Sequence, residues 1–374
     1  MRIGIDARLY NESGVGRYIR NLLNELQILD KENIYYIFLL NESFNKITFS
    51  NNFQKVLADI RWYGFSEQLK LPLLLNKYHL DLLHIPHFNV PLLYSGKVVV
   101  TIHDLIHQKF QMQRASTKNA LDYKIKKIGY KKIFTKAINK SQKIFVVSEY
   151  IKEELMKSCQ VPSEKIVITQ EAVDQTIINL SKKITEKEIK KVIKKFNIKY
   201  PYLFYVGNAH PHKNIEGLIN AFLQIKKNYQ HLKLVLSGND HYFWQKIKEQ
   251  YRNKNIIYTG FVSDQELVAL YKSSLAYVIP SLDEGFGIPL LEAFACGCPV
   301  LSSNIKSLQE VGGDAALYFD SSSREDFMDK LILIINNQAL RTKLIARGQR
   351  RYKHFSWNKL AKQTLSIYQE VLKT

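Results

Sequence analysis

The chain has few residues with the chemistry of a disulfide framework or a metal site. Its 374 residues include three cysteines, Cys159, Cys296 and Cys298, too few for such a framework. This usage suits a reducing cytoplasm, because disulfide frameworks belong to oxidising compartments. Cys296 and Cys298 lack the second thiol pair or nearby histidines that a zinc site needs. The histidines between His79 and His107 match no metal signature either, so we predict no bound metal.

Long apolar runs are also missing. No run of about 18 apolar residues occurs, so the sequence predicts no helix that spans a membrane. The amino-terminal segment Met1–Asp6 lacks the apolar core of a signal peptide. We therefore expect a cytoplasmic protein, either free or peripheral on the inner face of the cytoplasmic membrane.

Arginine is scarce in a chain that is otherwise strongly basic. The formal net charge is +20, but only 12 of the 54 basic residues are arginines. Base readout and bidentate phosphate contacts favour arginine, so the charge gives little support to nucleic-acid binding. Between Lys118 and Lys143 there are nine lysines and one acid, interleaved with apolar residues. This stretch predicts a basic amphipathic helix, either packed on its own sheet or resting on an anionic membrane surface.

The length and the pattern of elements predict two α/β domains. Short β-branched runs alternate with amphipathic segments, which is typical of parallel sheets wound in β-α-β units. We expect a doubly wound, Rossmann-like domain over 1–174, joined by a final helix over 357–374, and a second over 175–356. Their ligands would lie in a cleft between facing sheets, at the carboxyl ends of the strands. The expected strands are 2–6, 35–40, 81–85, 98–102, 143–148, 202–206, 233–237, 256–260, 276–280, 300–302 and 316–319.

The segment from Glu284 to Glu292 is the most informative part of the sequence. It follows a predicted buried strand and leads into a predicted helix. Its glycines permit close backbone approach, and Pro289 suits the first helical position. A strand, a glycine loop and a helix N-terminus together offer N–H groups to a phosphate. Glu284 would stay in the loop and face a sugar, whereas Glu292, in the first turn, would face a nucleoside. The plainer alternatives are a turn residue and a carboxylate that pairs with the helix dipole.

Other loops at predicted strand ends carry further candidates. Gly14 and Gly16 would let the backbone approach a diphosphate or sugar before a helix from Tyr18. Without a third glycine they are no dinucleotide fingerprint, and a tight turn is the alternative. His103 would orient a hydroxyl or cap a turn. Lys213 would neutralise a leaving phosphate or be an ordinary surface lysine.

These blocks together resemble the retaining glycosyltransferases of family 4, and especially their bacterial mannosyltransferase-like members. That family implies the GT-B architecture, in which two Rossmann-like domains face each other. The spacing of Glu284 and Glu292, in agreement with the other blocks, carries the resemblance. The similar segments run nearly end to end: 3–8, 14–18, 101–105, 147–151, 205–214, 237–238, 260–267, 284–292, 297–300 and 355–357.

The resemblance implies a role for each candidate. His103 would contact the transferred sugar, Lys213 would stabilise the leaving diphosphate, and Glu284 would hold sugar hydroxyls. Glu292 would bind the ribose and Val262 the base. The family often has an arginine in the Gly207 loop or just before the lysine, where this chain has Asn208 and His212. The donor-binding residues implied are Gly14, Gly16, Asn208, Val262, Phe286, Gly287, Ile288 and Glu292.

The activity implied is retaining transfer of a hexose, with mannose favoured, from a nucleoside diphosphate sugar. The acceptor would be a glycan or lipid-linked glycan in surface polysaccharide synthesis. GDP-mannose is the favoured donor and a UDP-sugar the alternative, with no divalent metal. An anionic membrane surface is a further expected partner, through Lys118–Lys143. Two other readings are a nucleotide-sugar epimerase of the same architecture and a basic nucleic-acid-binding protein, the latter suggested by charge alone.

Overall fold

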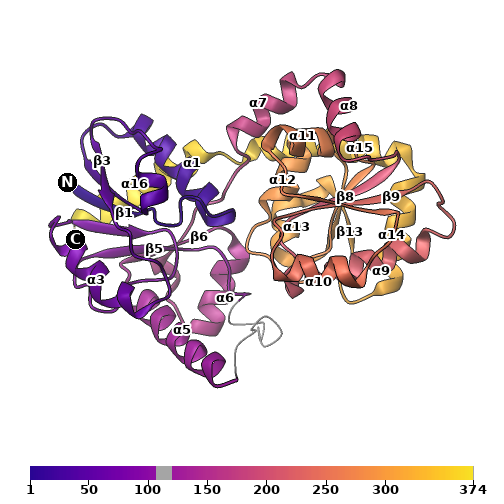
Figure 1. Cartoon of the computed structure of the whole chain (residues 1–374). Helices are drawn as coiled ribbons and strands as arrows, with labels where there is room; N and C mark the ends of the chain where they lie inside the picture. Colours follow the sequence, from indigo (N-terminus) through magenta and orange to yellow (C-terminus); the bar gives the residue numbers. More distant parts are fainter. Residues whose placement is uncertain (107–119, 374) are drawn as a thin grey trace. The chain divides into compact units, whose positions relative to one another are not determined.

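The computed structural model describes residues 1–106 and 120–373 (Figure 1). It divides into two compact units, Met1–Glu171 with Ser356–Thr374, and Ala172–Phe355, called the first and second unit below. The chain leaves the first unit after Glu171 and returns to it at Ser356. Among the described residues, no helix combines the length and apolar character needed to cross a membrane.

The first unit is built on a parallel sheet of seven strands in the order β3-β2-β1-β4-β5-β6-β7. The strand order reverses between β1 and β4, which pair directly through Ile3 and Leu82. Most of these strands are buried and apolar, as expected for a parallel sheet covered on both faces. The strands are β1 (Arg2–Asp6), β2 (Ile34–Leu39), β3 (Phe53–Leu57), β4 (Leu82–Ile85), β5 (Val98–Ile102), β6 (Lys143–Val146) and β7 (Ile166–Ile168).

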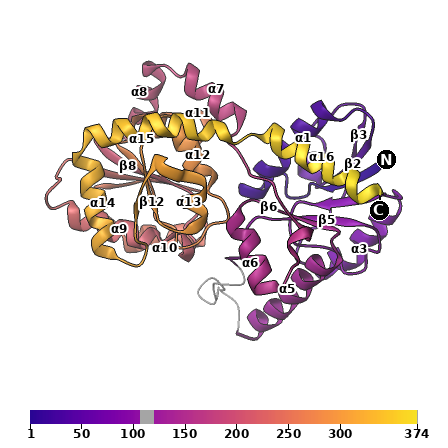
Figure 2. The ribbon, with the colours of Figure 1, turned by 180° about the vertical axis from the view of Figure 1, so that it is seen from behind.

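Helices cover both faces of this sheet. The carboxy-terminal helix α16 packs against α1 (Figure 2). It carries Tyr368, whose hydroxyl bonds to His84 on β4. On the other face, α5 buries Phe134 and Ile138 but leaves Lys131 and Lys136 exposed. The helices are α1 (Gly14–Leu29), α2 (Asn41–Phe44), α3 (Phe65–Asn76), α5 (Ala120–Lys140), α6 (Glu149–Cys159) and α16 (Trp357–Lys373).

The second unit repeats the plan with a parallel sheet of six strands in the order β10-β9-β8-β11-β12-β13. Its order reverses between β8 and β11, where Leu203 pairs with Ala276. One large apolar cluster, including Phe222, Trp244 and Phe327, packs between this sheet and its helices. The strands are β8 (Tyr202–Val206), β9 (Lys233–Ser237), β10 (Ile256–Gly260), β11 (Ala276–Ile279), β12 (Val300–Ser303) and β13 (Ala316–Phe319).

The helices of the second unit begin mostly at side-chain caps. Ser263 and Glu266 form the capping box that their spacing predicts, and Thr185 and Glu188 form another. The stretch between β7 and β8 contains α7 and α8 and no strand. The helices are α7 (Gln175–Lys183), α8 (Glu186–Lys195), α9 (Ile215–Ile225), α10 (Tyr242–Gln250), α11 (Asp264–Ser273), α12 (Ile288–Ala295), α13 (Lys306–Gly312), α14 (Arg324–Asn336) and α15 (Gln338–Arg351).

The predicted strands are confirmed, but two strands were missed. β3 and β7 occupy the two edges of the seven-stranded sheet. β3 contains Gln54 and Lys55, and β7 has only three residues, so neither has the long apolar pattern of a central strand. The predicted basic helix is confirmed from Ala120 onward, whereas Lys118 lies outside the described residues. Nothing is described of the side chains at 120–127 either, which include three of the nine lysines.

Candidate functional site

Two candidate residues of the second unit come from the loops at its strand-order reversal. Lys213 lies in the loop after β8, in a short 3-10 turn over Pro211–Lys213. Glu284 lies in the loop after β11. The loops are joined by a bond from the amide of Leu282 to the carbonyl of His212, at 2.7 Å. In open α/β sheets, ligands bind outside the carboxyl ends of the strands at such a reversal.

Lys213 and Glu284 form an ion pair. The Lys213 Nζ lies 2.7 Å from both carboxylate oxygens of Glu284, and the Ser281 hydroxyl donates to Oε1 at 2.6 Å. The two side chains are 18% and 10% exposed, so the pair is largely withdrawn from water but still reachable. Charges in such a setting interact more strongly than they do in bulk water. The structure therefore places the predicted cation and the predicted sugar-binding acid in direct contact.

The glycine loop before α12 has the geometry that its sequence suggests. Gly287 has a φ of +97°, and a Cβ there would lie 2.5 Å from the Leu308 side chain. No other residue fits this position without strain. Phe286 is buried against Phe355, which anchors the loop from beneath. The first N–H groups of α12, beginning at Ile288, have no partner within the helix by their position.

The expected place of Glu292 in the helix was wrong. α12 begins at Ile288 rather than at Pro289, so Glu292 is its fifth residue and lies beyond the first turn. The helix starts one residue early because Gly287 adopts the left-handed conformation and lets Ile288 enter the helix directly. Glu292 is buried, and the Tyr271 hydroxyl donates to its Oε2 at 3.4 Å. The helix dipole acts mainly within the first turn, so it explains the position of Glu292 less well.

Of the remaining donor-site candidates of the second unit, Asn208 shares the loop after β8 with Lys213, whereas Val262 follows β10. Asn208 is exposed in the loop after β8, and its side chain accepts from the amide of His210 at 3.3 Å. His212 is buried, with its ring 5.8 Å from that of His210. Val262 is buried after β10, two strands away from β8. The structure thus groups Lys213 with Glu284, whereas Val262 belongs to a different strand end.

Gly14 and Gly16 lie inside α1, not in a loop before it. The helix was expected from Tyr18 and begins at Gly14, because glycine tolerates the first turn of a helix. A Cβ on Gly16 would lie 2.6 Å from the Tyr10 carbonyl oxygen, whereas a Cβ on Gly14 would meet nothing within 4 Å. Close backbone packing therefore explains Gly16 without a ligand. A ligand role for Gly14 stays a prediction.

His103 follows β5 and is held from both sides. Its Nδ1 lies 3.2 Å from Glu171 Oε1, and its Nε2 lies 3.1 Å from the Pro86 carbonyl oxygen. The ring of Tyr18 meets it edge-on, with 4.8 Å between centroids. Glu171 was missed by the sequence analysis because it follows a three-residue edge strand far along the chain. The structure shows that His103 is positioned by groups from three separate segments.

A buried polar chain stands behind His103. The Tyr18 hydroxyl contacts Thr101 Oγ1 at 3.1 Å, and Thr101 in turn contacts His84 Nε2 at 2.8 Å. The other nitrogen of His84 bonds to the Tyr368 hydroxyl. Burial lowers the pKa of His84 to about 3, so this ring is neutral at neutral pH. The chain therefore ties α1 and α16 to the centre of the sheet without a charge.

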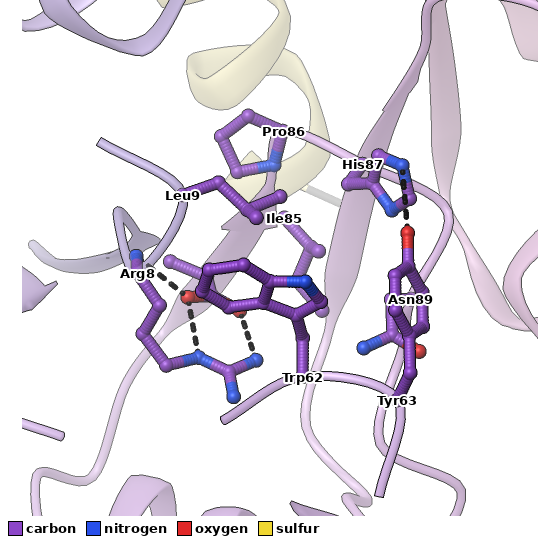
Figure 3. Close-up of a pocket in the computed structure, with 9 residues that line it drawn as sticks. Arg8, Leu9, Trp62, Tyr63, Ile85, Pro86, His87 and Asn89 are labelled. Atoms are coloured by element: carbon purple, nitrogen blue, oxygen red, sulfur yellow. Dashed lines mark hydrogen bonds and ion pairs between the residues drawn. The ribbon is translucent and has the colours of Figure 1, made fainter. Parts of the chain in front are cut away.

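A pocket in the first unit was not anticipated. It lies at the reversal of the seven-stranded sheet, where Asp6 ends β1 and Ile85 ends β4. Figure 3 shows Trp62 between Arg8 on one side and Tyr63, His87 and Asn89 on the other. The Asp-Ala-Arg run at residues 6–8, which begins at the last residue of the first strand, was the available sequence signal. Among the described residues, no group of three or more His, Cys, Asp or Glu side chains is arranged to hold a metal ion.

Comparison with family models decides the class. Residues 13–176 match the model of Glycosyltransferase Family 4, and residues 186–351 match that of Glycosyl transferases group 1. The two models together account for most of the chain. The protein is a glycosyltransferase, with a Glycosyltransferase Family 4 domain followed by a Glycosyl transferases group 1 domain. Each model falls largely within one of the two structural units.

Known relatives agree with this assignment. The glycosyltransferase is 28% identical to "O-antigen chain mannosyltransferase B" of Escherichia coli, over 96% of each chain. The structure of WaaG, "a glycosyltransferase involved in lipopolysaccharide biosynthesis", is 15% identical, with a TM-score of 0.76 over 98% of this chain and 99% of that one. Anabaena Alr3699/HepE in complex with UDP and glucose is 14% identical, with a TM-score of 0.75 over 99% of each chain. These structures establish the GT-B fold. Neither the epimerase nor the nucleic-acid-binding alternative gains support.

Proposed function

We propose that this glycosyltransferase moves a hexose, with mannose favoured, from a nucleoside diphosphate sugar to a glycan acceptor in surface polysaccharide synthesis, with retention of configuration. The relative that matches over 96% of both chains is by name an O-antigen chain mannosyltransferase, which supports the sugar and the acceptor class. The Lys213–Glu284 pair at the reversal of the second sheet carries the proposal on the structural side.

The donor would bind to the second unit, with its diphosphate near Lys213 and the start of α12. The leaving diphosphate gains negative charge as the sugar–oxygen bond breaks, so a fixed cation and helix N–H groups stabilise the transition state. The backbone of Phe286, Gly287 and Ile288 would supply those N–H groups. This arrangement needs no divalent metal, although Asn208 and His212 stand where related enzymes often have an arginine. Glu292 would bind the ribose and Val262 the base.

The ion pair suggests how donor binding is coupled to sugar positioning. Without a ligand, Glu284 neutralises Lys213 through both carboxylate oxygens. A diphosphate that draws Lys213 away would leave those oxygens to accept bonds from sugar hydroxyls. A carboxylate accepts such bonds strongly, and the Ser281 hydroxyl already fixes its orientation. Glu284 would therefore orient the hexose rather than attack it, and the sugar contact of His103 stays a prediction.

The donor is tested by binding and transfer together. GDP-mannose is the favoured donor and a UDP-sugar the alternative. We expect GDP-mannose to raise the melting temperature of the purified enzyme, because a ligand that binds the folded state alone stabilises it. UDP-glucose, UDP-galactose and GDP serve as the comparison panel, in buffer with a chelator. Stabilisation by no nucleoside diphosphate sugar, together with no transfer to a mannose oligosaccharide, would refute the proposed function.

The acceptor side would include an anionic membrane surface. The described part of α5 exposes Lys131, Lys132 and Lys136. On α3, Phe65, Leu69 and Leu73 recur every four residues and are 91%, 61% and 68% exposed. Figures 1 and 2 show both helices on the same face of the seven-stranded sheet. Lysines attract anionic headgroups and exposed apolar side chains enter the interface, so this face suits a lipid-linked acceptor.

Flotation with vesicles tests this surface. The enzyme should float with phosphatidylglycerol vesicles and not with phosphatidylcholine vesicles. The double variant Phe65→Ser, Leu69→Ser should lose most of the floated fraction. Ile28→Ser is the matched control, because Ile28 is equally exposed but lies on α1, over the other face of the sheet. Equal flotation of all three proteins, or none for the unmodified enzyme, would remove membrane contact through this face.

A further inference from the structure

We propose that Ser281 is a positioning residue that keeps Glu284 in place after the donor has drawn Lys213 away, and that Ser303 holds Ser281 from the neighbouring strand. The inference rests on the proposed function and names the groups that would act on binding of the sugar but not on binding of the nucleotide. It starts from the two side chains that donate to Glu284, those of Lys213 and Ser281.

The two donors to Glu284 leave different oxygens free. Among the residues that the structure describes, Lys213 donates to both carboxylate oxygens at 2.7 Å, whereas the Ser281 hydroxyl donates to Oε1 at 2.6 Å. If Lys213 withdraws, Oε1 keeps its bond to Ser281, and Oε2 is left with open lone pairs. Oε2 is therefore the oxygen that would accept from a hydroxyl of the bound hexose.

Glu284 needs such a second donor because its side chain is long. A glutamate has three rotatable side-chain bonds, so without a partner it samples several rotamers and no longer presents one oxygen to the sugar. Ser281 is fully buried, so water does not compete for its hydroxyl. A hydrogen bond from a hydroxyl to an ionised carboxylate is short and strong, and the distance of 2.6 Å fits this class. Ser281 can therefore hold the carboxylate by itself.

The backbone of Ser281 is fixed from two sides. Ser303, the last residue of β12, is fully buried, and its hydroxyl donates to the Ser281 carbonyl at 2.6 Å. The next amide, that of Leu282, donates to the His212 carbonyl at 2.7 Å. Ser281 is thus tied both to the adjacent strand and to the loop that carries Lys213. Its hydroxyl starts from a fixed position whether or not Lys213 contacts Glu284.

Two buried tyrosines near Glu284 are committed elsewhere. Burial raises the pKa of Tyr205 and of Tyr277 well above the ordinary value, and the negative charge of Glu284 raises both further. Both hydroxyls are therefore neutral at neutral pH. The Tyr205 hydroxyl donates to the Asn208 carbonyl at 2.8 Å, and that of Tyr277 lies 3.5 Å from the Val206 carbonyl. These tyrosines support the loop after β8 and leave Glu284 to Ser281.

Calorimetric titration of the purified enzyme separates the sugar from the nucleotide. Ser281→Ala should bind GDP as the unmodified enzyme does, because Lys213 and the start of α12 are unchanged. It should bind GDP-mannose about tenfold more weakly, which is the usual value of one hydrogen bond to a charged group. Ser303→Ala should show a smaller loss in the same direction. If the donor panel selects a UDP-sugar, that sugar nucleotide and UDP replace the guanosine pair.

Ser181→Ala is the matched control. Ser181 is also buried in the second unit, and its hydroxyl donates to the Ala295 carbonyl at 3.0 Å. This variant should bind both ligands normally. An unchanged affinity of Ser281→Ala for GDP-mannose would overturn the inference alone. An equal loss for GDP would also overturn it, because the substitution would then disturb the whole loop. If the unmodified enzyme binds no nucleotide sugar, the proposed function fails and the inference fails with it.

Urea unfolding tests the same role without a ligand. Ser281→Ala should cost little stability in the unmodified enzyme, because Lys213 still contacts both oxygens of Glu284. The same substitution should cost more in a Lys213→Met background, where Ser281 is the side chain left to hold the carboxylate. Residues that share a partner show such non-additive effects. Additive losses for the two substitutions would mean that Ser281 does not hold Glu284 once the lysine is gone, and would overturn the inference.

Discussion

The two sheets reverse their strand order in the same way, but the side chains at the two reversals differ in charge. In the first unit, Arg8 is enclosed by two carboxylates, and the pocket above it has aromatic walls. In the second unit, Lys213 faces a single carboxylate, that of Glu284. The same unit contains the glycine loop that leads into the N-terminus of α12. Topology therefore fixes where a ligand binds, and the loops decide which ligand. The cation of the first reversal is outnumbered by carboxylates, whereas the cation of the second is matched by a single carboxylate.

The largest effect is expected from Lys213→Ala. Its kcat/KM for transfer should fall about 10²–10³-fold, because a preorganised group at the developing charge is lost. Steady-state assays with GDP-mannose measure this, and Lys190→Ala, an exposed lysine on α8, is the control. Glu284→Gln should lose about 10–100-fold, the usual value of a bond to a charged group. If Lys213→Ala keeps a rate within threefold of the unmodified enzyme, Lys213 does not stabilise the developing charge.

The corresponding substitution in the first unit, Arg8→Met, should lower the stability of the fold. Arg8→Met leaves Asp6 and Glu67 without their counter-charge, and breaking a buried ion pair in this way costs about 3–5 kcal/mol. Urea unfolding should show a larger loss for Arg8→Met than for Lys213→Met, because the latter strands a single carboxylate. The opposite order would mean that Lys213, rather than Arg8, is the structural cation.

Alanine variants of Gly14 and Gly16 distinguish a role in helix packing from a role in ligand binding. Gly16→Ala should destabilise the first unit by about 1–3 kcal/mol, because the new Cβ overlaps the Tyr10 carbonyl. Gly14→Ala has open space, so its stability should not change. If Gly14 contacts a ligand, as the family resemblance implies, this variant loses transfer rate at an unchanged melting temperature. Full activity in Gly14→Ala would assign both glycines to helix packing.

The smallest effect concerns pH. Burial raises the pKa of Glu67, so the folded protein holds this proton more tightly than the unfolded chain does. The contribution of Glu67 to stability therefore falls as the pH rises above the ordinary glutamate pKa of about 4.3. Glu67→Gln should remove that slope, and the variant should gain on the unmodified enzyme between pH 4.5 and 7. If the melting temperatures of the two proteins change with pH in parallel over this range, Arg8 fully offsets the effect of burial on the pKa of Glu67.

Local patterns were enough to predict the sheets. Runs such as 98–102 and 276–280 are apolar and β-branched, which identifies a buried parallel strand without any partner. The glycine loop before α12 was equally predictable, because Gly287 and Pro289 have special backbone requirements. β3 and β7 escaped because edge strands are exposed on one side and need no continuous apolar run.

Pairings between distant residues were beyond the sequence. Glu284 and Lys213 were each identified, but nothing in the sequence shows that they bind one another across 71 positions. Glu67 and Glu171 look like ordinary helix and loop acids until the fold brings them to Arg8 and His103. The pocket was missed for the same reason, since its lining residues come from the ends of β1 and β4 and from the loop between β3 and α3.

The position of α16 has a consequence for the order of folding. The first unit contains the start of the chain and also its last helix, whose Tyr368 is fully buried against His84. During synthesis, all residues of the second unit emerge before this helix does. The side of α1 that packs against α16 therefore stays uncovered until the second unit has been made. The first unit thus begins before the second unit and is completed after it.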